Sequence, residues 1–287
     1  MKIIDVGSGS PIVLVPGIQG RWEWMTPTVD ALATRARVIT FSLADEPTCD
    51  GVFDPESGFD CYVRQIADAM DAAGVQRAAI CGVSYGGLVA AAFAARHADR
   101  VSALILVSAI PPTWRPDQRA RFYLRAPLLM TPLFMLGSLR TYPEIAAAVP
   151  GTFRALMAAA RHGATVLGHM FSPRRMARRV SLLSNLNVVE ELRPLCVPTL
   201  IITGEPALDR VVPVQMTQEY ARMWPHAVQA TLARTGHFGL ITRPAEFSRL
   251  ITQFVEASMN DERKDVGETR TERDTDTAEN DRRRRIV

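Results

Sequence analysis

The chain has 287 residues, of which 47% are hydrophobic and 22% charged, and its formal net charge at pH 7 is +3. This composition is typical of a soluble globular α/β protein and not of a disordered chain. The net charge is too small to indicate nucleic-acid binding by itself. The most apolar run, residues 126 to 139, is shorter than the roughly 20 residues that cross a bilayer, so we expect no transmembrane segment.

Short apolar runs alternate with helical stretches over residues 1 to 110. This alternation predicts a doubly wound, mostly parallel sheet with helices on both faces. Strands are expected at residues 2–6, 11–16, 37–43, 78–84 and 103–109, and helices at 24–36, at 58–74 and in the alanine-rich segment after Ser84.

Residues 111 to 192 interrupt this alternation with prolines, methionines and arginines, and we expect them to form an inserted helical cap. The α/β pattern resumes over residues 193 to 258, with strands at 198–205 and 227–234 and helices at 213–224 and 244–258. Residues 259 to 287 are charged and nearly without apolar groups, which predicts a disordered tail. The arginine run near its end is either a docking patch or a solvated chain end.

The cysteines show no sign of a disulfide framework or a zinc site. They lack a Cys-x-x-Cys pair and histidines at metal-ligand spacing. No secretion signal is expected either, because Asp5 and Gly7 interrupt the first apolar run. We therefore interpret the four cysteines as free thiols of a cytoplasmic protein. The four are Cys49, Cys61, Cys81 and Cys196.

A serine bracketed by glycines follows the fourth predicted strand. The chain from Gly82 to Gly86 reads Gly-Val-Ser-Tyr-Gly, with an apolar strand before it and a helix after it. A side chain at such a sharp turn takes strained backbone angles, which need neighbours without Cβ atoms. The motif by itself could mark only a glycine-rich turn, but its context predicts that Ser84 is a nucleophile.

A serine hydroxyl needs a base that removes its proton as it attacks. Of five histidines, His237 is the best candidate because it follows the last predicted strand, directly after Gly236, and precedes the final helix. Structural roles are expected for the other four, which are His97 at a helix end, His162 and His169 in the cap, and His226 in a turn.

The base in turn needs a carboxylate that fixes its tautomer. Glu205 and Asp209 both follow the sixth predicted strand. We favour Asp209, because Glu205 stands at the strand end, where it could face inward or cap the turn. The chain order of serine, aspartate and histidine then distinguishes one serine-triad fold from the others.

These segments resemble the α/β hydrolase superfamily, in its type with a serine nucleophile and a helical cap. The resemblance covers roughly residues 1 to 258 and rests on residues 7–43, 80–109, 197–213 and 236–255. It implies the α/β hydrolase fold and an oxyanion hole formed by the backbone N–H groups of Ile18 and Tyr85.

The chain departs from the family pattern at three places. Pro16-Gly17 stands where the family usually has His-Gly, and residues 43–58 replace its usual glycine-rich loop. The aspartate also lies farther from Gly204 than in the common Gly-x-x-Asp turn. The side chain that usually supports the oxyanion loop is therefore absent, and the shape of one side of the site is not predicted. The identity of the acid also stays undecided between Asp209 and Glu205.

A serine nucleophile excludes the aspartate-nucleophile branches of this superfamily and implies an acyl-enzyme intermediate. His237 would take the proton of Ser84 and pass it to the leaving group, with no metal or organic cofactor. We predict hydrolysis of a carboxylic ester, lactone or thioester. An acyltransferase, a carbon–carbon bond hydrolase or a non-catalytic ligand-binding protein could carry the same residues.

The cap concentrates positive charge, because residues 111 to 190 contain eleven arginines and three acidic residues. Its apolar segment 122–136 would suit the acyl or aromatic group of a small-molecule substrate. The arginines would attract an anionic head group or make weak contact with a membrane surface, unless they are simply solvated. Trp22 and Trp24 either line the substrate pocket or pack beneath the oxyanion loop.

Overall fold

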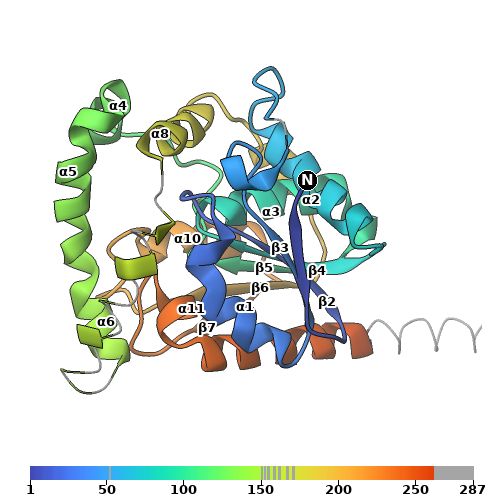
Figure 1. The fold of residues 1–287 in the computed structure, drawn as a ribbon. Coiled ribbons are helices and arrows are strands. Elements are labelled where there is room, and N and C mark those ends of the chain that lie inside the picture. The colour runs from blue at the N-terminus through green and yellow to red at the C-terminus, as the bar shows by residue number, and fades with distance from the viewer. Residues whose placement is uncertain are drawn as a thin grey trace, which may run out of the picture.

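The computed structural model describes residues 1–51, 53–149, 151, 153, 156–157, 160, 163–165, 168–169 and 172–261, and within them a seven-stranded sheet has the order β1-β3-β2-β4-β5-β6-β7. β1 runs antiparallel to β3, and the other neighbouring strands are parallel. The predicted α/β fold with a mostly parallel, doubly wound sheet is therefore confirmed (Figure 1). The strands are β1 (Ile3–Val6), β2 (Pro11–Val15), β3 (Arg37–Phe41), β4 (Ala78–Val83), β5 (Val101–Val107), β6 (Thr199–Thr203) and β7 (Val228–Thr231).

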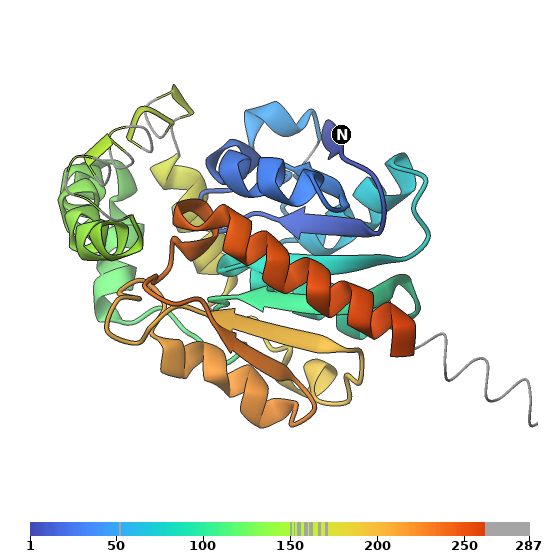
Figure 2. The same cartoon turned by 90° about the horizontal axis from the view of Figure 1, so that it is seen from below.

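Successive residues of the central strands bury two separate apolar layers, because side chains alternate between the faces of a sheet. In β2, Val13 and Val15 belong to the layer under α2 (Asp60–Ala72), α3 (Tyr85–Arg96) and α10 (Val214–Met223). Ile12 and Leu14 belong to the layer on the opposite face of the sheet, which is covered by α1 (Thr26–Ala33) and the last helix, residues 244 to 261. This face is at the bottom in Figure 1, and we call its layer the lower apolar layer. Figure 2 shows this last helix running along the lower face of the sheet.

The helical insertion lies between β5 and β6. Its described elements are α4 (Gln118–Arg125), α5 (Pro127–Ser138), η4 (Leu139–Thr141), α6 (Tyr142–Ala148), α8 (Pro173–Leu182) and α9 (Val189–Leu192). Figure 1 shows α5 at the edge of the molecule, away from the sheet. It packs chiefly on α4, α8 and η4, which leaves Leu129 73% exposed and Leu136 63% exposed. Phe122, Leu128 and Leu133 are exposed as well, so the described part of the segment 122–136 presents several apolar side chains to solvent.

The end of the chain is longer in helix than expected. The last helix passes Ser258 and reaches residue 261, because Met259 still packs against the lower apolar layer. The remainder of the predicted tail, including Arg282 to Arg285, lies outside the described residues, as does His162. Over the ranges given above, no helix is both long enough and apolar enough to cross a membrane.

Candidate active site

Ser84 occupies the sharp turn between β4 and α3. Its backbone has φ 54° and ψ −114°, and the residue is 5% exposed. A Cβ atom at Gly82 would lie 2.2 Å from the carbonyl oxygen of Gly86, and one at Gly86 would lie 2.4 Å from that of Pro16. The turn therefore has no room for a side chain at position 82 or 86, and the packed strand and helix hold Ser84 in its strained conformation.

A third glycine lets α3 approach the sheet closely. A Cβ atom at Gly87 would lie 2.4 Å from the Cβ of Ala109, which follows β5. The backbone of Ser84 is also tied to this strand, because its N–H donates to the carbonyl oxygen of Val107 at 2.8 Å. The position of the hydroxyl is thus fixed by backbone contacts on both sides.

The other candidate residues lie at the same edge of the sheet as Ser84, because each follows the carboxyl end of a parallel strand. Ser84 follows β4, Asp209 lies in the turn after β6, and His237 follows β7. Because β4, β5, β6 and β7 are adjacent and parallel, their carboxyl ends share one edge. Asp209 is 4% exposed and His237 is 7% exposed. The three residues selected from the sequence therefore lie at one buried edge.

Asp209 faces the imidazole of His237. Its Oδ2 atom lies 3.5 Å from Nδ1 of the ring. This is longer than a well-formed hydrogen bond, although catalytic hydrogen bonds commonly shorten when substrate binds. Nδ1 is buried and has no hydrogen-bond partner in the described part of the chain. Asp209 is thus placed to accept its proton once the ring moves slightly.

The turn after β6 fixes the carboxylate of Asp209. Oδ1 accepts hydrogen bonds from the N–H groups of Val211 and Val212 at 3.1 and 3.0 Å, and Oδ2 accepts one from the Ser108 hydroxyl at 3.0 Å. Burial acts to raise the pKa of Asp209, but the interactions with His237 and with the two N–H groups outweigh it and hold the pKa below its ordinary value. The group is therefore a charged acceptor of defined orientation.

Glu205 has a different role. Its Oε1 atom accepts the backbone N–H of Arg234 at 2.7 Å, and its own N–H donates to the carbonyl oxygen of Thr235 at 2.7 Å. It therefore caps the turn that leads to His237, which is one of the two roles considered for it above. The geometry favours Asp209 as the acid.

Two glycines allow close contact between the turn after β6, which carries Asp209 (the acid turn), and the loop after β7, which carries His237 (the histidine loop). A Cβ atom at Gly204 would lie 2.5 Å from the Cα of Gly236, and one at Gly236 would lie 2.6 Å from the carbonyl carbon of Leu208. Since Leu208 and Gly236 directly precede Asp209 and His237, this close backbone contact sets the separation of the pair. The longer acid turn of this chain is thereby accommodated.

The loop after β2 brings Ile18 to the elbow. A tight turn closes it, since the N–H of Gly20 donates to the carbonyl oxygen of Gly17 at 2.9 Å. A Cβ atom at Gly17 would lie 3.6 Å from the Cβ of Ser84. Tyr85 begins α3, where first-turn N–H groups have no acceptor within the helix. The two residues assigned to an oxyanion hole therefore flank Ser84.

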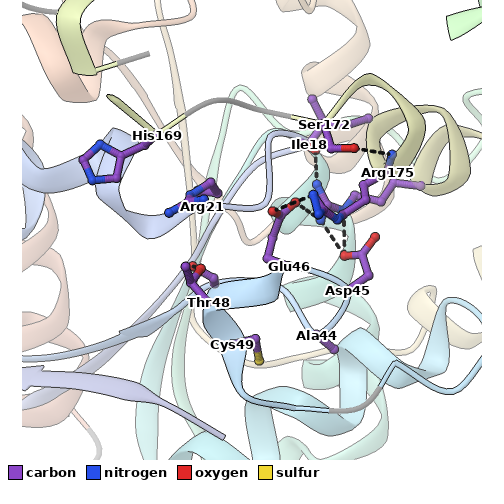
Figure 3. Close-up of polar contacts among 12 residues, drawn as sticks. Ile18, Arg21, Ala44, Asp45, Glu46, Thr48, Cys49, His169, Ser172 and Arg175 are labelled. Atoms are coloured by element: carbon purple, nitrogen blue, oxygen red, sulfur yellow. Dashed lines mark hydrogen bonds and ion pairs between the residues drawn. The ribbon is translucent and has the colours of Figure 1, made fainter. Parts of the chain in front are cut away.

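A buried arginine of the cap holds this loop. Arg179, on α8, is fully buried; its Nη1 donates to the carbonyl oxygen of Ile18 at 2.6 Å, and its Nη2 lies 2.6 Å from Oε1 of Glu46. It also forms an ion pair with Asp45. In Figure 3, dashed lines run from one guanidinium group to Ile18, Asp45 and Glu46. The cap is thus tied to the loop after β2 through a charged group without access to solvent.

The neighbours of Arg179 are shaped to receive it. Burial acts to lower the pKa of Arg179, but Asp45 and Glu46 outweigh this effect and keep the pKa above its ordinary value. Gly20, at φ 77°, leaves the required space, because a Cβ atom there would lie 2.3 Å from the guanidinium nitrogens. The expectation that the cap arginines are solvated or attract anions is therefore wrong for Arg179, which has two carboxylate partners inside the protein.

A cleft of about 370 Å³ lies between the cap and the core beside the histidine loop. Its lining includes Trp24 and Phe238 from the core and Ile145 and His169 from the cap. Trp24 crosses this boundary, since its Nε1 donates to the carbonyl oxygen of His169 at 3.1 Å. Trp22 instead packs against the lower apolar layer. Trp24 therefore lines this cleft, and Trp22 does not.

These features agree with a known family. The model of the "Alpha/beta hydrolase family" matches residues 12–250. The chain belongs to this family. The solved structure of an enol-lactonase from Burkholderia xenovorans LB400 superposes on the chain with a TM-score of 0.72, at 19% identity, over 89% of this chain and 96% of its own.

Two sequence relatives of this α/β hydrolase carry hydrolase names. A putative carbamate hydrolase, RutD, of Pseudomonas savastanoi pv. phaseolicola is 24% identical over 253 residues, which cover 86% of this chain and 93% of the relative. A 2-hydroxymuconate semialdehyde hydrolase of Pseudomonas putida is 26% identical over 269 residues, covering 88% and 89%. The family and these relatives support a hydrolase activity for the chain.

Proposed function

We propose that this α/β hydrolase is a serine hydrolase that cleaves a carboxylic ester, lactone or thioester through an acyl-enzyme intermediate. One observation carries the proposal: Ser84, in its strained turn, shares a buried sheet edge with the pair of Asp209 and His237 at 3.5 Å. Acyl transfer of this kind needs a hydroxyl that attacks, an imidazole that accepts its proton and a fixed carboxylate that orients the imidazole. The chemistry requires no metal or organic cofactor.

The first half of the reaction acylates Ser84. His237 accepts the hydroxyl proton as Oγ attacks the carbonyl carbon, and the carboxylate of Asp209 stabilises the imidazolium that forms. The N–H groups of Ile18 and Tyr85 then donate to the oxyanion, each contributing roughly 3 kcal/mol by comparison with measured oxyanion holes. Collapse of the tetrahedral intermediate breaks the bond to the leaving group, which takes the proton from His237.

The second half releases the acid. His237 takes a proton from water, the resulting hydroxide attacks the acyl carbon, and the same two N–H groups stabilise the second tetrahedral intermediate. Collapse of this intermediate returns the proton to Ser84 and frees the carboxylic acid. Ile18 and Tyr85 act through their backbones, so their side chains can be changed without removing the donors.

Labelling with a fluorophosphonate probe tests the proposal. The probe phosphonylates an activated serine, and we expect it to label Ser84, to fail with Ser84→Ala and to react slowly with His237→Ala. Peptide mapping of the labelled protein identifies the site. A folded protein that remains unlabelled would contradict the assignment and favour a ligand-binding role. Equal labelling of the Ser84→Ala variant would contradict it by locating the reactive residue elsewhere.

A carbon–carbon bond hydrolase is the second candidate, and the relative named 2-hydroxymuconate semialdehyde hydrolase supports it at 26% identity. A substrate panel separates the two. It contains p-nitrophenyl esters of increasing chain length, lactones, acyl thioesters and a vinylogous diketone. Turnover of the diketone with a kcat/KM far above that of every ester would favour the second candidate, and the reverse ranking would favour the first.

A further inference from the structure

One acidic residue of the cap reaches the histidine loop. Glu144 lies on α6 and is only 1% exposed, and its Oε1 atom accepts the backbone N–H of Phe238, the residue after His237. The backbone N–H of Gly236, the residue before His237, acts together with that of Phe238 to lower the pKa of this carboxyl. A side chain of the cap therefore holds the loop at the residue that directly follows the candidate base.

The second oxygen of Glu144 is without a partner. Oε2 is buried and has no hydrogen-bond partner among the described residues. The neighbouring positions of α6, Ile145 and Ala148, are buried and apolar. Contact between the cap and the core would be made at lower cost by a third apolar side chain, because a half-satisfied buried carboxyl is destabilising. The presence of this acid calls for a role beyond packing.

We propose that Glu144 is a positioning residue for His237. On this view, which rests on the proposed function, its carboxylate orients the loop through the N–H group of Phe238 and supports the imidazolium that forms when Ser84 attacks. Because Glu144 is part of the cap, this support exists only while α6 is seated on the core. Full activity then requires a docked cap and an ionised Glu144.

The charges around Glu144 determine how its ionisation responds to pH. Burial raises the pKa of Glu144 to about 7; the N–H groups of Phe238 and Gly236 and the charge of His237 act in the opposite direction, and Asp209 acts to raise it further. α11 (Gly239–Thr242), which packs on α6, contains no titratable residue. α6 itself carries Tyr142, and η4 carries the exposed Arg140. Glu23, Asp30 and His169 line the same cleft as Ile145 of α6.

The pH dependence of kcat/KM for a p-nitrophenyl ester, measured for wild type and Glu144→Gln, tests the proposal. Below pH 7 the wild-type carboxyl is protonated and uncharged, like the amide, so the two proteins should be similar. Above pH 7 only the wild type has the negative charge. The ratio of wild type to variant should therefore rise with a midpoint near pH 7, to on the order of tenfold, which is the effect of one pKa unit.

Glu219→Gln is the matched control. Glu219 lies on α10, accepts the Thr113 hydroxyl at 2.6 Å with Oε2 and has a buried Oε1 without a partner in the described chain. Its ratio to wild type should be independent of pH. For Glu144→Gln, a ratio that is equally reduced at every pH would indicate a purely structural role and overturn the proposal, as would a ratio of one throughout.

A titration that needs no activity gives a second test, which holds even if Glu144→Gln does not fold. Carbon-13 NMR of protein labelled at the glutamate carboxyl should show one group that titrates near pH 7 in wild type and moves to higher pH in His237→Gln. An unchanged midpoint in His237→Gln would overturn the coupling. Absence of fluorophosphonate labelling with this shift intact would instead refute the proposed function alone.

Discussion

Replacement of Arg179 by methionine is expected to destabilise the protein strongly and to lower its activity. The change removes the guanidinium that is shared by Asp45, Glu46 and the carbonyl oxygen of Ile18. Both carboxylates have side chains that are no more than 1% exposed, so water cannot replace the lost partner. Of the two buried carboxylates, only Glu46 then keeps a cationic neighbour, the partly exposed Arg175 at 3.5 Å.

The size of the effect follows from the burial of these groups. Removing one partner of a buried ion pair typically costs about 3–5 kcal/mol of unfolding free energy. For a domain of this size, such a loss lowers Tm by on the order of 10 °C. Activity should fall in addition, because the loop that carries the N–H of Ile18 loses its anchor to α8.

Arg175→Met is the matched control for this prediction. Arg175 lies on the same helix and contacts the same Glu46, but at 3.5 Å and with 27% of its side chain exposed. Because the distance is long and water reaches the arginine, we expect this contact to contribute no more than about 1 kcal/mol. Urea unfolding and kcat/KM of both variants provide the comparison. If Arg179→Met is no less stable than Arg175→Met, the argument that a desolvated charge cluster anchors the cap is refuted.

Three further changes address the site itself. Ser108→Ala removes a hydrogen bond to a buried carboxylate, worth about 1.5–3 kcal/mol, and kcat/KM should fall by roughly ten- to hundredfold in steady-state assays; an unchanged value would show that Asp209 is oriented without it. Gly87→Ala should lower the unfolding free energy by about 1–3 kcal/mol in chemical denaturation, because the added methyl would overlap the Cβ of Ala109. Gly163→Ala should not lower it, because among the described residues no atom beyond its own helix and chain neighbours lies within 4 Å of the added Cβ. Asp209→Asn should reduce ester turnover far more than Glu205→Gln, and the opposite ranking would reassign the acid. Because the pKa of Asp209 is lowered in the folded state, the stability that Asp209→Asn removes should be present above about pH 4 and disappear as the pH falls further.

Local sequence signals were sufficient for the fold and for the positions of the three candidate catalytic residues. Apolar runs of strand length, separated by amphipathic helices, specify a parallel sheet, since strands buried on both faces consist mostly of apolar residues. Glycines at positions 82 and 86 identify the elbow because the turn excludes a Cβ atom two residues before and two residues after Ser84. The placement of Asp209 and His237 after successive strands follows from the same topology, because parallel strands present their carboxyl ends at one edge.

Contacts between residues far apart in the chain were decided only by the tertiary structure. Ser108 and Asp209 meet because β5 and β6 are neighbours, and nothing in the sequence around Ser108 marks its hydroxyl as a donor. Arg179 is one of eleven arginines in residues 111 to 190, and only the docking of α8 on Asp45 and Glu46 separates it from the others. Glu144 likewise becomes significant where α6 touches the histidine loop. Periodicity and turn chemistry record the local environment of a residue, whereas a buried charge acquires its partner when distant segments pack together.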